Sequence, residues 1–201
     1  MNRFLAFFSY LFHPLFIPLY TTVCFFVLRK TYIFPAEIFL LIVQVIIVTI
    51  LIPMAFYFLL KTAGKADSVM LADVRQRRVP LLLQTLLILL LLWQSISPHR
   101  VPELFFFFLG ALVTSAACLG FALAQIRVSL HMAAMAAMLL FVIGLSIHAQ
   151  RNAVWLVVFL LLVTGLTASS RLEMKAHDFK ELILGFSCGL LPQVGFWFLW
   201  L

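Results

Sequence analysis

The sequence predicts an all-α fold, namely a polytopic transmembrane helical bundle of about six to seven spans. Hydrophobic residues make up 65% of its 201 residues and charged residues only 10%, whereas a soluble domain is usually about one quarter charged. The apolar runs are long and unbroken instead of alternating with polar residues. Because lipid offers the backbone no hydrogen-bond partner, such runs are expected to cross the membrane as helices.

Seven apolar runs approach the ~20 residues that a helix needs to cross a bilayer. They cover residues 4–27, 34–60, 80–97, 104–125, 128–148, 152–169 and 182–201. The first run contains Pro14 and Pro18, which interrupt a straight helix, so we expect this run to be kinked or re-entrant. No linker is long enough to divide the chain, and we therefore expect residues 1–201 to form a single integral-membrane domain.

Small residues four positions apart mark the places where helices are expected to approach closely. Gly185 and Gly189 form a G-x-x-x-G pattern in the last run, and Ala133 and Ala137 have the same spacing in the fifth run. Small side chains let two helix backbones come together within a membrane. We therefore expect these residues to lie at helix contacts.

The polar segments are distributed unevenly between the two faces of the predicted bundle. Consecutive spans alternate in direction, and three polar clusters (61–80, 125–131 and 170–181) follow the second, fourth and sixth runs. The opposite face receives only the short connections 29–32, 97–103 and 148–152. This segregation predicts one composite polar site at one membrane surface.

Net charge and cysteine spacing exclude several other classes of protein. The chain has a net charge of +7, but its basic residues lie between apolar runs, which fits lipid headgroups or phosphate better than nucleic acid. Cys24, Cys118 and Cys188 lie within apolar runs and show no paired spacing. The sequence therefore indicates neither a disulfide framework nor a zinc site.

The third polar cluster contains residue types suited to phosphate chemistry. His177 and Glu181 are four residues apart, a spacing that places both on one face of a helix and lets the carboxylate fix the imidazole tautomer. Arg171 lies upstream, in the expected turn before that helix, where a guanidinium can bind a phosphate with two hydrogen bonds. Taken alone, the segment also fits a charged loop that faces lipid headgroups.

The second cluster adds a histidine and a possible anion contact. His131 begins an apolar run, with Arg127 and Ser129 just before it. A histidine beside an arginine at a helix entrance is well placed to donate a proton or to contact an anion. An amphipathic surface residue is the alternative for a lone histidine at this position.

The first cluster adds a dense group of guanidinium side chains. Arg75, Arg77 and Arg78 precede Pro80, and they suit phosphoryl oxygens or, alternatively, act as a block of charge that sets membrane topology. Two histidines, a carboxylate and several arginines on one face together favour phosphoryl transfer.

These three clusters resemble the signatures of the type 2 phosphatidic acid phosphatase (PAP2) superfamily. The segment 170–181 reads S-R-x5-H-x3-E and is similar to the third signature, S-R-x5-H-x3-D, with Glu181 in place of Asp. V-S-L-H at 128–131 resembles the second signature, P-S-G-H, and R-R-V-P at 77–80 resembles part of the first, K-x6-R-P. The resemblance covers about residues 61–190. The lysine of the first signature falls on 70–72, which holds no lysine, so this phosphate contact is either missing or supplied by another residue such as Lys65 or Arg75.

The resemblance implies a role for each matching residue. His177 attacks phosphorus to form a phosphohistidine, Glu181 orients it, and His131 protonates the leaving oxygen. Arg171 and one or both of Arg77 and Arg78 hold the phosphoryl oxygens, and Ser129 adds a hydrogen bond. The neighbouring Arg127 is a further candidate phosphate contact. No metal and no cofactor is expected, because the arginines supply the positive charge. The expected substrate is a lipid phosphate, such as phosphatidic acid, phosphatidylglycerophosphate, a polyprenyl diphosphate or a lipid A phosphate.

Two other classes of protein remain as alternatives. A haem or metal protein would draw on His13, His131, His148 and His177, but His148 is expected on the opposite face. A non-enzymatic transporter or headgroup-binding scaffold with a basic anion site is the second alternative, although transporters usually place polar groups near mid-membrane.

The membrane and the orientation of the chain rest on charge and on the resemblance. We expect a cell (inner) membrane protein that contacts membrane lipids and no nucleic acid, and the sequence leaves its oligomeric state open. Most Lys and Arg residues fall on the cluster face, which by the positive-inside rule favours the cytoplasm. Arginines that bind phosphate weaken this bias, and the resemblance implies a site on the extracytoplasmic side.

Overall fold

The computed structural model describes residues 3–29, 33–64 and 73–201, and within them it contains helices and no strand. Six helices are long and apolar enough to cross a membrane. The predicted all-α fold and the predicted integral-membrane class are therefore confirmed. The helices are α1 (Arg3–Leu11), α2 (Ile17–Leu28), α3 (Pro35–Ile46), the π-helical turn η1 (Ile47–Leu51), α4 (Ile52–Thr62), α5 (Val74–Gln94), α6 (Pro102–Leu123), α7 (Leu130–His148), α8 (Val154–Glu173) and α9 (Phe179–Trp200).

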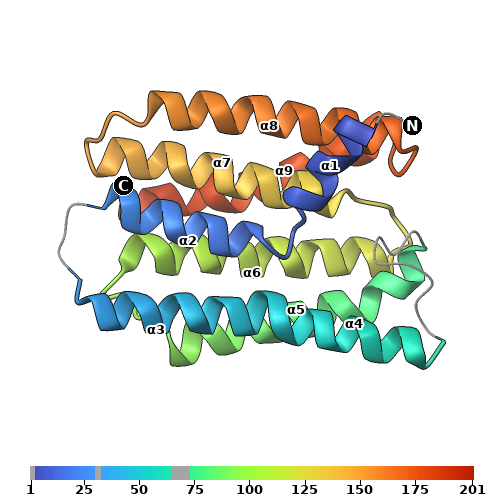
Figure 1. Ribbon diagram of the computed structural model, residues 1–201, viewed down its shortest axis with the longest axis horizontal. Coiled ribbons are helices and arrows are strands. Elements are labelled where there is room, and N and C mark those ends of the chain that lie inside the picture. Colours follow the sequence, from blue (N-terminus) through green and yellow to red (C-terminus); the bar gives the residue numbers. More distant parts are fainter. Residues whose placement is uncertain (1–2, 30–32, 65–72) are drawn as a thin grey trace.

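The six long helices lie side by side and alternate in direction (Figure 1). Helices α3, η1 and α4 form one continuous span over Pro35–Thr62. The C-terminal ends of α4, α6 and α8 and the N-terminal ends of α5, α7 and α9 lie at the same end of the bundle, at the right of Figure 1. We call this end the site end and the other the opposite end. The prediction that the three polar clusters share one face is confirmed for their described residues.

The first apolar run is broken into two short helices, as the prolines predict. Helix α1 ends at Leu11 and α2 begins at Ile17, because Pro14 has no backbone N–H and disfavours a helical residue before it. Pro18 is tolerated in the first turn of α2, where its missing N–H would have no intrahelical partner. At 12 residues, α2 rises only ~18 Å, which is shorter than the hydrocarbon core.

Two helices extend further toward the site end than the apolar runs predict. Helix α5 begins at Val74, six residues before the predicted run, with Asp73 as its N-cap. Helix α8 continues to Glu173. The prediction that Arg171 lies in the turn after the span is therefore wrong, since this residue lies in the last turn of α8.

Helix α7 is the most buried of the six spans and packs against α2, α6, α8 and α9. Gly185 and Gly189 on α9 face the backbone of α7, where a Cβ at either glycine would collide with the carbonyl of Ser129 or Ala133. The prediction that Gly185, Gly189 and Ala133 lie at helix contacts is thus confirmed. It brings the start of α9 against the start of α7, where the candidate site lies.

Candidate functional site

A cavity of about 380 Å³ lies within the bundle and reaches the site end. It is lined by side chains from the α1–α2 break and from α4, α5, α6, α7 and the α8–α9 region. Most of its lining is apolar, but four of the predicted site residues also line it, namely Arg77, His131, Arg171 and His177. The structure therefore brings residues from all three polar clusters to one cavity.

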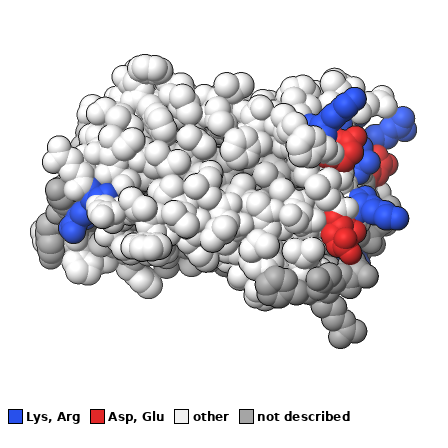
Figure 2. Space-filling model, turned by 90° about the horizontal axis from the view of Figure 1, so that it is seen from above, with Lys and Arg blue, Asp and Glu red and all other residues white. Residues whose placement is uncertain are grey.

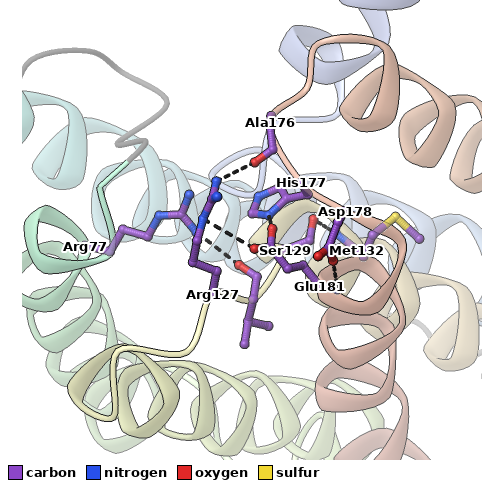
Figure 3. Close-up of polar contacts among 9 residues, drawn as sticks. Arg77, Arg127, Ser129, Met132, Ala176, His177, Asp178 and Glu181 are labelled. Atoms are coloured by element: carbon purple, nitrogen blue, oxygen red, sulfur yellow. Dashed lines mark hydrogen bonds and ion pairs between the residues drawn. The ribbon is translucent and has the colours of Figure 1, made fainter.

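His177 and Glu181 are in contact, although not because both belong to one helix. Helix α9 begins at Phe179, and the side chain of its N-cap, Asp178, accepts a hydrogen bond of 2.8 Å from the Glu181 backbone N–H. His177 therefore precedes the helix. Its Nδ1 lies 2.6 Å from Glu181 Oε2 (Figure 3), and the carboxylate accepts the Nδ1 proton. This tautomer leaves the lone pair of the neutral ring on Nε2.

The surroundings of His177 favour the neutral imidazole. Burial lowers the pKa of His177 from 6.5 to about 4, and the hydrogen bond to Glu181 opposes this shift while the charges of Arg77 and Arg171 add to it. Burial disfavours the charged ring because the imidazolium loses its hydration. At neutral pH the ring is therefore unprotonated, which is the form that acts as a nucleophile.

Glu181 is held by contacts to both neighbouring loops. Its Oε1 lies 3.4 Å from Arg127 Nε, and its backbone carbonyl accepts a hydrogen bond of 3.2 Å from the Ser129 N–H. Arg127 Nη2 also donates to the Ala176 carbonyl at 2.8 Å, next to His177 (Figure 3). Arg127 does not line the cavity. Arg127 therefore positions the Glu181 carboxylate and does not itself contact the cavity.

Arg77 and Arg171 are the two guanidinium groups that line the cavity. Arg171 is only 2% exposed and Arg77 only 5% exposed. Arg77 Nη1 donates to the Val128 carbonyl at 3.1 Å, which ties the start of α5 to the loop before α7. A buried guanidinium loses hydration and therefore favours an anionic ligand that can replace the lost water.

His131 and Ser129 are both buried at the start of α7 but have different surroundings. His131 Nε2 lies 3.0 Å from the Ser9 carbonyl of α1. Because a carbonyl only accepts, Nε2 carries a proton here. Ser129 is the N-cap of α7, its Oγ accepts from the Met132 N–H, and it does not line the cavity. The structure places His131 at the cavity and gives Ser129 a role at the helix terminus.

Arg78 points to a different place from Arg77. Its Nε and Nη2 donate to the carbonyls of Ala122 and Leu123, at 3.1 and 3.3 Å. These carbonyls belong to the last turn of α6, where they lack partners within the helix. Arg78 is absent from the cavity lining, so the structure does not bring it to the predicted phosphate site. Of the two candidate replacements for the signature lysine, Arg75 is exposed and does not line the cavity, and Lys65 lies outside the described residues.

Sequence reasoning did not assign His13 or Gln84 to the phosphate site, yet both line the cavity. The His13 ring lies against the ring of His131, with centroids 5.2 Å apart and planes at 84°. Each lies within an apolar run whose few polar residues form no periodic pattern, and only the H-P pair at 13–14 indicated a break that can turn a side chain inward.

Among the described residues, no group of three or more His, Cys, Asp or Glu is placed to hold a metal ion. The chain matches no protein-family model, no curated protein sequence and no solved structure. The function must therefore be argued from the geometry of the cavity and the residues around it.

Proposed function

We propose that this protein is a membrane-embedded lipid phosphate phosphatase that works through a phosphohistidine, as its resemblance to the PAP2 superfamily implies. The observation that carries the proposal is the hydrogen bond of 2.6 Å between His177 Nδ1 and Glu181 Oε2. It directs the reactive lone pair to Nε2 of a residue that lines the same cavity as Arg77, Arg171 and His131.

The first step forms a bond between His177 and phosphorus. His177 Nε2 attacks the phosphorus atom, the bond from phosphorus to the leaving oxygen breaks, and Glu181 stabilises the positive charge that develops on the ring. The guanidinium groups of Arg77 and Arg171 neutralise the phosphoryl oxygens in the transition state, where their fixed charge is most effective. Positive charge from arginine serves here in place of a metal ion.

The second histidine carries the proton through both steps. The leaving oxygen replaces the Ser9 carbonyl as the partner of His131 Nε2–H and takes a proton from the imidazolium, the form that a bound phosphoryl anion favours. His131 then removes a proton from the water that attacks the phosphohistidine. The P–N bond breaks, inorganic phosphate leaves, and His177 and His131 return to their starting states.

The apolar part of the cavity suits the hydrocarbon portion of a lipid substrate. Phe107 and Ala137 line it among the six long helices, whereas the arginines and histidines lie toward the site end. A phosphomonoester or diphosphate headgroup with an apolar tail matches this polarity. Phosphatidic acid, phosphatidylglycerophosphate, polyprenyl diphosphates and lipid A phosphates all satisfy it, and we propose that the site faces the extracytoplasmic side of a cell (inner) membrane.

The direct test is phosphate release by detergent-purified protein from a panel of these lipids. We expect release by the wild type, a loss of about 10³-fold or more in His177→Gln, and wild-type release in His99→Gln, whose histidine is exposed at the opposite end. Equal release by the wild type and His177→Gln would remove the nucleophile assignment. Binding of lipid phosphates without release would instead favour a headgroup-binding scaffold.

The orientation has a separate test in intact cells. Lys175 lies between α8 and α9 at the site end, so Lys175→Cys places a thiol beside the proposed site. We expect an impermeant thiol reagent to label this variant. Protection of the thiol in intact cells, with labelling after lysis, would reverse the orientation.

A further inference from the structure

A third histidine reaches the cavity from outside the three polar clusters. His13 lies in the break between α1 and α2, directly before Pro14, and it lines the cavity together with His131, Arg171 and His177. Its place depends on the break, because Pro14 disfavours the helical conformation at the residue before it. The broken N-terminal segment therefore contributes a polar side chain to the proposed site.

The orientation of the His13 ring is fixed from two sides. Its Nδ1 accepts a hydrogen bond from the Leu15 backbone N–H at 3.4 Å, and since a backbone N–H only donates, the proton of the neutral ring is on Nε2. The ring also packs edge-on against His131, with centroids 5.2 Å apart. His13 thus carries an N–H donor beside His131, whose own Nε2–H is directed to the Ser9 carbonyl.

The segment that carries His13 is anchored to both sides of the site. The Ser9 carbonyl on α1 accepts a hydrogen bond from His131 on α7. The Ser9 Oγ lies 2.6 Å from the Oγ of Ser170 on α8. Ser170 directly precedes Arg171. Because α1 is tied to the residues beside both His131 and Arg171, His13 is held in a defined position relative to them.

We propose that His13 is a substrate-binding residue whose Nε2–H donates a hydrogen bond to the phosphoryl group bound by Arg77 and Arg171. That a phosphoryl group binds here follows from the proposed function, whereas the choice of His13 follows from the geometry of the break between α1 and α2. No bond forms or breaks at His13. One hydrogen bond to a charged oxygen corresponds to about 10- to 100-fold in affinity or in kcat/KM.

Three variants distinguish hydrogen-bond donation by His13 from packing of its ring against His131. His13→Phe keeps a ring against His131 but removes the donor, His13→Gln places an amide N–H near the position of Nε2, and His99→Phe is the matched control at the opposite end. Each is assayed for inorganic phosphate binding by calorimetry and for lipid phosphate hydrolysis, with the melting temperature as a check of folding. We expect His13→Phe to lose about 10- to 100-fold in both, His13→Gln to recover most of the loss, and His99→Phe to match the wild type.

The two assays distinguish failure of this inference from failure of the proposed function. A folded His13→Phe that binds phosphate and hydrolyses lipid like the wild type overturns the inference alone, and so does a His13→Gln variant as weak as His13→Phe. Phosphate binding without hydrolysis in the wild type overturns the phosphatase, and the binding series then still decides the role of His13. A wild type that neither binds nor hydrolyses overturns both.

Discussion

The two ends of the bundle carry the same kinds of charged residues in different surroundings. At the opposite end, Arg100 Nη2 lies 3.1 Å from Glu37 Oε1, and these side chains are 72% and 39% exposed. At the site end, Arg77 and Arg171 are buried and line a cavity. Figure 2 shows charged side chains gathered at the ends of the molecule, with uncharged surface between them. Charge alone therefore marks both ends as membrane boundaries, and the buried arginines that line a cavity distinguish the end that carries the candidate site.

This difference has an energetic meaning. An exposed ion pair contributes about 0–1 kcal/mol, because water screens it and both side chains lose conformational freedom. Burying a guanidinium lowers the stability of the fold by several times that amount unless the group gains partners of opposite charge. The two buried arginines beside the cavity can take a bound anion as such a partner, in addition to their contacts within the protein. Substitutions at each end test whether the two ends differ in this way.

Among the arginine substitutions that compare the two ends, the largest effect is expected from replacing the buried Arg171 with a different cation. Arg171→Lys keeps the charge but loses the planar pair of N–H donors that fits phosphoryl oxygens. We expect kcat/KM for lipid phosphate hydrolysis to fall by about 10²- to 10³-fold, while Arg100→Lys at the opposite end stays within about twofold of the wild type. Similar losses in the two variants would remove the contrast between the ends.

The protonation state of His177 provides a second test at the site end. Because burial lowers the pKa of His177 from 6.5 to about 4, the folded protein holds this ring neutral at a pH of about 5.5, where a histidine in water is mostly charged. The stability that the neutral ring contributes is fully present above about pH 6.5 and is lost as the pH falls toward 4. The measurement is an NMR titration of ring-labelled histidine, assigned by the signal missing in His177→Gln. A His177 signal that titrates near 6.5 would contradict the buried site.

Glycine contacts at the two ends should respond differently to an added methyl group. At Gly189 a Cβ would collide with the Ala133 backbone, whereas at Gly144, toward the opposite end, it would meet only side-chain atoms, those of Trp197 and Trp200. We expect Gly189→Ala to lose about 1–3 kcal/mol of stability and Gly144→Ala to lose less. Thermal melting in detergent measures both.

A third glycine supplies the control for helix propensity. Among the described residues, no atom of another helix lies within 4 Å of the position that an added methyl carbon would occupy at Gly165 on α8. Gly165→Ala is therefore expected to gain up to about 1 kcal/mol of stability. If Gly189→Ala gains as much as Gly165→Ala, the close approach of α7 and α9 is not tight enough to position the site.

Arg78 distinguishes a structural arginine from a ligand-binding one within the same cluster. Its guanidinium donates to the last carbonyls of α6, and we expect Arg78→Gln to lower stability by about 1 kcal/mol while kcat/KM stays within about threefold of the wild type. Melting curves and hydrolysis rates, compared with those of Arg171→Lys, check this. A loss of activity as large as that of Arg171→Lys would restore Arg78 as a phosphate contact.

The sequence predicted the fold, the shared face and the core of the site because these follow from periodicity and alternation. Apolar runs fix the spans, and alternating direction brings His131 and His177 to one end. The sequence could not show which of Arg77 and Arg78 contacts the cavity, since the side chains of neighbouring residues on a helix differ by about 100° in direction. Which of the two faces the cavity depends on the rotation of α5 within the bundle.

Two other residues show related limits of the sequence. A lone histidine in an apolar run gives no periodic signal, and only tertiary packing of the broken segment brings His13 beside His131. Asp178 is one of several charged residues in the segment 170–181, and in the structure it caps α9 by accepting a hydrogen bond from the Glu181 N–H three residues later. The position of the helix start determines this role, and helix boundaries are weakly specified by sequence.

The smallest effect is expected at the exposed ion pair of the opposite end. Because Arg100 and Glu37 are both solvent-accessible, Arg100→Gln and Glu37→Gln should each change stability by less than about 1 kcal/mol, and a double-mutant cycle should give a coupling of ~0.5 kcal/mol or less. Raising the salt concentration should reduce this coupling further. Hydrolysis by all three variants should equal that of the wild type, because these residues lie at the far end of α3 and α6 from the cavity's arginines. A coupling of several kcal/mol would mean that the opposite end is also a buried electrostatic site, and the contrast between the ends would fail.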